Sequence, residues 1–178
     1  MTREAILRAL RLLSEELDEA GTHGELCLFG GTVMVLAYAA RPATRDVDAI
    51  FQPTQSVRTA ARRVAMAEGL PEDWLNDGVK GYLSTRHATT TGDLPQFPAL
   101  RLTMPVPEYL LAMKCMAARL TGTTGEPSDV ADIRFLIRQL RLRSAAEVLD
   151  LVVQYYPTQR ISPKTQYVVE GLFEEEQP

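Results

Sequence analysis

The sequence predicts an α/β (α+β) fold in which a small mixed sheet is followed by a helical C-terminal lobe. Up to about residue 105, short apolar runs of strand length alternate with stretches of helical periodicity. Beyond that point the apolar residues recur only at helical spacing. We therefore expect an α/β core over residues 1–105 and a helical lobe over residues 106–178, forming one compact unit with a cleft between them.

The first half of the predicted core begins with a helix. Apolar residues at helical spacing predict it over residues 3–20, and glycines at positions 21 and 24 end it in a turn. The mostly apolar segment 25–29 has glycine on both sides, which favours a buried strand. Two further glycines follow at once, and residues 32–40 then suit a second helix that Pro42 ends.

The second half of the core contains two more predicted strands. Residues 45–51 have partly alternating polarity and an apolar end, which indicates a strand, and residues 54–68 form the next helix. Glycine and proline interrupt residues 69–96 so often that we expect loops with short elements there. Residues 100–104 are the candidate third strand. The predicted helices of the lobe span residues 107–120, 127–140, 144–155 and 162–173.

The composition is that of a globular protein, with 46% hydrophobic and 24% charged residues among 178. No apolar run approaches the roughly 20 residues of a membrane span, and no signal peptide is visible, so we expect a cytoplasmic protein without a membrane partner. The net charge of −4 argues against a protein that coats nucleic acid through bulk charge. Arg58, Arg62 and Arg63 favour a solvated helix face over a dedicated RNA site. Cys27 and Cys115 lie in apolar segments, which favours buried free thiols.

The glycine pair after the first predicted strand is a candidate phosphate site. Gly30 and Gly31 would let the backbone approach an anion closely, and the first N–H groups of the following helix, beginning near Thr32, would point at it. A pair of glycines after a strand is also an ordinary tight turn. The pair alone therefore leaves both interpretations open.

The second candidate feature is Asp46-Val47-Asp48. Strand alternation places both carboxylates on one face, where they repel each other. A divalent cation would relieve that repulsion, and Mg²⁺ typically takes one or two carboxylates together with substrate phosphates. The alternative is an edge strand with a solvated acidic face. The apolar residues that follow Asp48 make an exposed edge less attractive.

Taken together, these features resemble the nucleotidyltransferase superfamily with the polymerase-β-like fold. Its signature is a glycine pair that opens a helix, followed after a spacer by Asp-x-Asp. The spacer and strand are similar to the AbiEii-type branch, which occurs as toxins of bacterial toxin–antitoxin pairs and tends to show Arg-x-x-Thr-x-Asp-x-Asp. The matching residues are Gly30, Gly31, Arg41, Thr44, Asp46 and Asp48.

A second motif resembles the same branch: a lysine in a helix, then an arginine, then an Asp-x-x-Asp helix. The matching residues are Lys114, Arg119, Asp129 and Asp132. From the residues alone, Lys114 either snorkels from an apolar helix or meets a triphosphate, and the two aspartates share a helix face where they also complement the helix dipole. Many members of the superfamily carry a third carboxylate on a later strand. Residues 100–103 offer none, so Asp129 or Asp132 would have to be the base, or the base is absent.

The resemblance implies a magnesium-dependent nucleotidyltransferase that moves a nucleoside monophosphate from an NTP to an acceptor. It implies one or two Mg²⁺ ions, with the tRNA 3′ end as acceptor and a cognate antitoxin protein as partner. The expected catalytic residues are Asp46, Asp48, Lys114, Asp129 and Asp132, of which Asp46 and Asp48 hold the metal. The expected nucleotide-binding residues are Gly30, Gly31, Thr32, Arg41, Lys114 and Arg119. The alternatives are a non-catalytic binding module with this fold and an adenylyltransferase for a small molecule such as an aminoglycoside.

Thr44 is a candidate regulatory site. It lies two residues before Asp46, so a phosphate on its hydroxyl would clash electrostatically with the metal site. The alternative is a β-branched residue that begins a strand.

Overall fold

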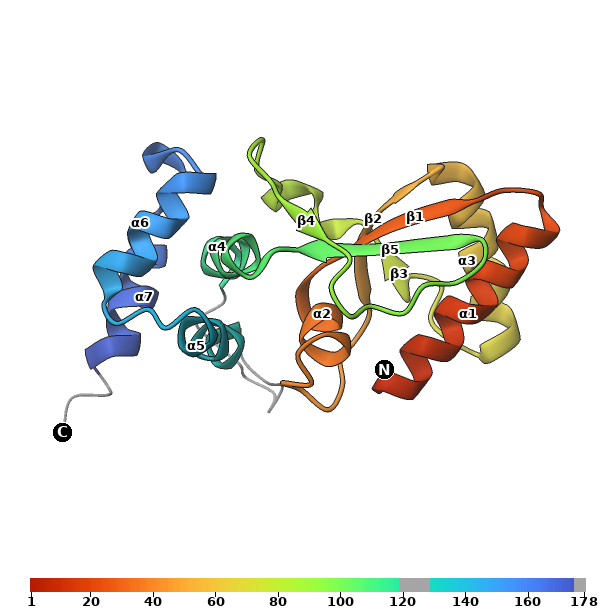
Figure 1. Ribbon diagram of the computed structural model, residues 1–178, viewed down its shortest axis with the longest axis horizontal. Helices are drawn as coiled ribbons and strands as arrows, with labels where there is room; N and C mark the ends of the chain where they lie inside the picture. Colours follow the sequence, from red (N-terminus) through yellow and green to blue (C-terminus); the bar gives the residue numbers. More distant parts are fainter. Residues whose placement is uncertain (119–128, 175–178) are drawn as a thin grey trace. The chain divides into compact units, whose positions relative to one another are not determined.

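A computed structural model describes residues 1–118 and 129–174, and the chain divides into two compact units. The first unit contains Met1–Gly81 and Thr89–Met104, and the second contains Tyr82–Ala88 and Pro105–Pro178 (Figure 1). The fold class is α+β, as the sequence predicts. The membership of Tyr82–Ala88 in the helical unit has no counterpart in the sequence pattern.

A five-stranded mixed sheet forms the centre of the first unit. The strands lie in the order β3-β2-β1-β5-β4. β1 pairs antiparallel with β2 and parallel with β5, and β2 pairs parallel with β3. The bounds of the strands are Gly24–Leu28 for β1, Val47–Gln52 for β2, Leu75–Asn76 for β3, Thr89–Thr90 for β4 and Leu100–Pro105 for β5.

Two long helices pack against each other in this unit, α1 (Arg3–Glu19) and α3 (Thr54–Glu68) (Figure 1). The apolar positions predicted from helical spacing are the buried ones in α1, with Ile6, Leu10, Leu13 and Leu17 at 0% exposure. Burial of such side chains stabilises the unit by about 1.5–3 kcal/mol each. The bounds of both helices agree to within a residue with those that the sequence predicts.

The short helix α2 (Gly30–Leu36) starts earlier and ends earlier than the predicted 32–40. Ala39 has a φ of 48°, in the left-handed region, so the chain has already left the helix before Pro42. β2 also starts late, at Val47 rather than Arg45, where the Val47 N–H donates to Trp74 O at 2.6 Å. Asp46 consequently lies just before the strand and Asp48 within it.

Four helices make up most of the second unit. They are α4 (Pro107–Ala117), α5 (Asp129–Gln139), α6 (Ala145–Tyr155) and α7 (Pro163–Glu174). α4 packs against each of the other three, and most of its residues are buried. None of the described helices combines the length and the apolar character that a membrane crossing would need.

The segment Tyr82–Ala88 is tied to these helices by Ser84. The buried Ser84 N–H donates to the Tyr109 hydroxyl at 2.9 Å, and the Ser84 hydroxyl donates to Tyr155 O. The Tyr156 hydroxyl donates to Tyr82 O at 2.5 Å. Because buried polar groups require partners, these bonds fix the segment on the helical unit.

Candidate functional site

Gly30 and Gly31 bring the backbone directly against two side chains of the 41–48 segment. Gly30 has a φ of +58°, and a Cβ there would lie 2.8 Å from Asp48 Oδ2. A Cβ on Gly31 would collide with Thr44 Oγ1 and would lie 3.1 Å from Arg41 Nη1. Both positions therefore require glycine, the first also for its conformation. The glycine pair and the Asp-x-Asp motif are in close contact.

Asp48 reaches Gly30 because of the pairing of β1 with β2. Phe29 N–H donates to Asp48 O at 2.8 Å, directly after the paired residues Leu28 and Ala49. Along β2, Val47 and Ala49 are buried whereas Asp48 is half-buried, so alternation directs the carboxylate away from the core face.

Asp46 is held from two sides. The Thr32 hydroxyl donates to Asp46 O at 3.1 Å, and Thr32 is fully buried. The Asn76 amide Nδ2 donates to Asp46 Oδ2 at 3.1 Å, from the neighbouring strand β3. Thr32, predicted as a nucleotide-binding residue, thus directs its hydroxyl at the protein backbone and ties α2 to the start of β2.

The start of the chain positions the loop that carries Thr44. Thr44 N–H donates to Met1 O at 3.0 Å, the Met1 amino group donates to Thr44 O, and Thr2 forms an antiparallel bridge with Ala43. The Arg3 guanidinium donates to Leu36 O, at the C-terminal end of α2. Thr44 is therefore held half-buried between residue 1 and Gly31.

The two carboxylates of this cluster are oxygen ligands of the type that Mg²⁺ takes in proteins. Asp46 and Asp48 supply two half-buried carboxylates. Among the described residues, no group of three or more His, Cys, Asp or Glu side chains is placed to hold a metal, so a cation here would have these two carboxylates as its side-chain ligands. Mg²⁺ is typically bound through one or two carboxylates and completes its octahedron with water and phosphate oxygens. The close approach of Gly30 to Asp48 leaves backbone, rather than a side chain, beside that carboxylate.

The lysine motif forms a separate cluster in the second unit. Lys114 Nζ lies 2.6 Å from Asp132 Oδ2 and 3.3 Å from Asp129 Oδ1. The Lys114 side chain is 8% exposed and that of Asp132 2%, whereas Asp129 keeps 27%. Lys114 does not snorkel to solvent, because its ammonium is buried in this ion pair. Arg119 lies outside the described residues.

Cys115 is a buried thiol, as the sequence predicts, whereas Cys27 is only partly buried. Cys27 and Cys115 are free, and burial raises the pKa of both thiols, that of Cys115 to about 12.

Each exposed arginine of α3 has an acidic partner. The pairs are Arg58 with Asp77 at 2.7 Å, Arg62 with Glu72 at 3.2 Å and Arg63 with Glu16 at 3.1 Å.

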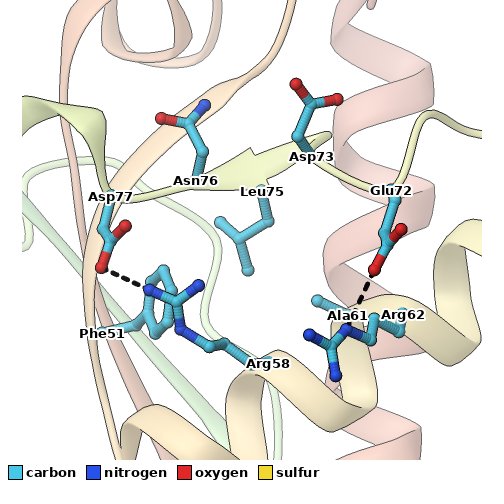
Figure 2. Close-up of a pocket in the computed structure, with 9 residues that line it drawn as sticks. All are labelled: Phe51, Arg58, Ala61, Arg62, Glu72, Asp73, Leu75, Asn76 and Asp77. Carbon is cyan, nitrogen blue, oxygen red and sulfur yellow. Dashed lines mark hydrogen bonds and ion pairs between the residues drawn. The ribbon is translucent and has the colours of Figure 1, made fainter.

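A pocket of about 410 Å³ lies between α3 and the segment around β3 (Figure 2). Leu75 points into it between two ion pairs, whereas Asn76 points away from the α3 arginines. None of the predicted site residues lines this pocket. The lining residues are Phe51, Arg58, Ala61, Arg62, Glu72, Asp73, Leu75, Asn76 and Asp77.

No protein-family model matches this sequence, and comparisons with curated proteins and with solved structures find no match.

Sequence reasoning missed Asn76 and Arg3 as neighbours of the site. β3 has two residues, which is too short for a periodicity signal, and its pairing with β2 is a long-range event. Arg3 lies in an amphipathic helix where a charged residue at that position looks like ordinary surface. Only the fold brings these side chains to the 30–48 segment.

Proposed function

We propose that the protein is a magnesium-dependent nucleotidyltransferase that moves a nucleoside monophosphate from an NTP to a hydroxyl acceptor. The observation that carries the proposal is the contact between the glycine pair and the Asp-x-Asp segment. Gly30 abuts Asp48 Oδ2, Gly31 abuts Thr44, and Asp46 lies two residues before Asp48. Such a cluster suits a triphosphate, because it offers close backbone approach beside two metal-binding carboxylates.

Each residue has a role in this proposal. Asp46 and Asp48 hold the magnesium, which when bound supplies charge neutralisation on the triphosphate. Gly30 and Gly31 admit the phosphates, and Arg41, whose Nη1 lies near Gly31, offsets their charge. The acceptor oxygen forms a bond to the α-phosphorus while the bond to the bridging oxygen of the β-phosphate breaks, and pyrophosphate leaves.

The acceptor's proton requires a base, for which we favour Asp129 over Asp132. Asp132 is 2% exposed and is bound to Lys114 at 2.6 Å, whereas Asp129 lies farther from that ammonium and is more exposed. Within the second unit, Lys114 contacts both carboxylates and so holds Asp129 beside Asp132.

By its resemblance to the AbiEii-type branch, we propose the tRNA 3′ end as acceptor and an antitoxin protein as partner. The test incubates the purified protein with each labelled NTP, Mg²⁺ and total RNA, and separates labelled RNA from labelled protein. We expect label in RNA with the wild type and a loss of at least about 100-fold in Asp48→Asn, since catalytic electrostatic groups contribute about that much.

The matched control is Asp77→Asn, because Asp77 is an acidic residue near β3 that pairs with Arg58 on the α3 side. That variant should transfer label like the wild type. If folded wild type labels neither RNA nor protein nor an added aminoglycoside with any NTP, the enzymatic proposal is wrong.

A second candidate is a module that binds NTP without turnover. The observation that favours it is the engagement of both helix aspartates by Lys114, which leaves neither carboxylate without a cationic neighbour. Magnesium-dependent NTP binding in calorimetry, together with no label transfer to RNA, protein or an aminoglycoside, would select this candidate.

A further inference from the structure

Asn76 is a polar side chain of β3 that the sequence patterns do not single out. Its Nδ2 donates to Asp46 Oδ2 at 3.1 Å. In the register of the parallel pair, Asn76 stands opposite Asp48. Because residues opposite each other in a sheet share a face, Asn76 and the two carboxylates converge on one side of the strands.

The orientation of the Asn76 amide is fixed. Gly78 N–H donates to Asn76 Oδ1 at 3.0 Å, so the oxygen is occupied and the NH₂ group is the end that meets the carboxylate. β3 itself is anchored. Val47 N–H donates to Trp74 O, and the buried indole of Trp74 donates to Ala61 O at 3.0 Å. A well-held donor therefore faces Asp46.

We propose that Asn76 is a positioning residue that orients the Asp46 carboxylate for the metal. The inference rests on the proposed function. The amide donates to one carboxylate oxygen and thereby directs the other toward a cation. It does so without adding negative charge beside Asp46 and Asp48, which already repel each other. Partners of this kind typically change metal affinity by about 10–100-fold when they are removed.

Asp77, the residue directly after β3, supplies a matched control on the α3 side. Asn76 points away from the α3 arginines, whereas Asp77 pairs with Arg58 (Figure 2). Asp77→Asn changes the residue next to Asn76 and weakens its pairing with Arg58, but it leaves the Asn76 amide that donates to Asp46 in place. Asn76→Leu keeps the size of the side chain and removes both polar atoms, and Asn76→Ala shortens the side chain to a methyl group.

The test measures Mn²⁺ binding to the full chain by the electron paramagnetic resonance signal of free Mn²⁺, with and without ATP. We expect both Asn76 variants to raise the Kd for Mn²⁺ about tenfold and Asp77→Asn to leave it within about twofold. Nucleotide transfer by the Asn76 variants should recover as Mn²⁺ is raised. A merely structural defect would not show that recovery, and thermal melting confirms that each variant is folded.

The outcomes separate this inference from the proposed function. If the wild type binds Mn²⁺ and the folded Asn76→Leu and Asn76→Ala variants bind it equally tightly, the role of Asn76 is wrong and the metal site stands. If the wild type binds no Mn²⁺ even with ATP, the metal site and the role of Asn76 both fail.

Discussion

At the scale of single residues, the candidate site depends on two glycines, which have no Cβ atom. Gly31 lacks the Cβ that would collide with Thr44 Oγ1, and Gly30 lacks the one that would lie 2.8 Å from Asp48 Oδ2. A side chain at either position would push the helix start away from the carboxylates. The glycine pair is thus required by packing whether or not a phosphate binds there.

We expect Gly31→Ala to destabilise the protein by about 1–3 kcal/mol, the usual range for overpacking. The cause is the clash with Thr44, so Thr44→Gly in the same chain should recover part of the loss. Urea unfolding measures both. Gly171→Ala is the control, since a Cβ there meets nothing within 4 Å in α7; a loss as large as that of Gly31→Ala would contradict the clash.

The Thr44 hydroxyl lies directly beside Gly31, so a charge on Thr44 would lie where the phosphates of the triphosphate are proposed to bind. We expect Thr44→Glu, which imitates a phosphate, to lower nucleotide transfer at least about tenfold by repulsion from Asp46 and from the triphosphate. Thr158→Glu, at an exposed position of the second unit, should have no effect. Transfer by Thr44→Glu at the wild-type rate would eliminate the regulatory hypothesis.

At the scale of elements, the ion pairs of Lys114 connect α4 to α5. A buried charge whose partner is removed costs more than the pair contributes. We expect Lys114→Met to destabilise the protein by about 3–5 kcal/mol, because Asp132 would keep a buried charge without its ammonium.

The double variant Lys114→Met with Asp132→Leu is the control for that prediction. It should recover most of the stability, since apolar side chains of similar size replace both charges. Urea unfolding of the four proteins gives the coupling free energy. Independent, additive losses would show that the pair does not act as a unit.

At the scale of the whole molecule, the chain passes between the two units after Gly81, after Ala88 and after Met104. Each unit has its own buried core, the first around the sheet and the second around α4. Ser84, through its bonds to Tyr109 and Tyr155, assigns the 82–88 segment to the helical unit. The stability of the helical unit is therefore open to a separate measurement.

Cys115 in α4 reports on that core. It is buried, and burial raises its pKa from 9.0 to about 12, so in a Cys27→Ser variant we expect it to react with a thiol reagent at pH 8 only as fast as the unit opens. The neutral thiol contributes stability that is complete below pH 9 and is lost between pH 9 and about 12.

Two measurements check this behaviour of Cys115. The labelling rate should rise with urea in parallel with unfolding, and the decline of unfolding free energy between pH 8 and pH 10.5 should be smaller in Cys115→Ala. Rapid labelling of the native protein would contradict a closed core around α4.

The sequence by itself determined the long amphipathic helices, the strands near residues 25, 47 and 100, and the glycine pair followed by Asp-x-Asp. Helical and strand periodicity record which face of an element is buried, so α1, α3 and β1 follow directly from the pattern. The sequence motif also groups Lys114 with Asp129 and Asp132. Because the two aspartates are one helical turn apart, the spacing predicts that both face the same neighbour, which is Lys114.

Only the tertiary structure decided which side chains share the site. The two-residue strand β3 brings Asn76 to Asp46, and the first residues of the chain hold Thr44 against Gly31. The tertiary structure also shows that Lys114 forms a buried ion pair with Asp132. The hydrogen bonds of Asn76, Met1 and Lys114 join residues 15 to 43 positions apart. No local pattern encodes them, because their free energy arises when distant strands and helices pack together.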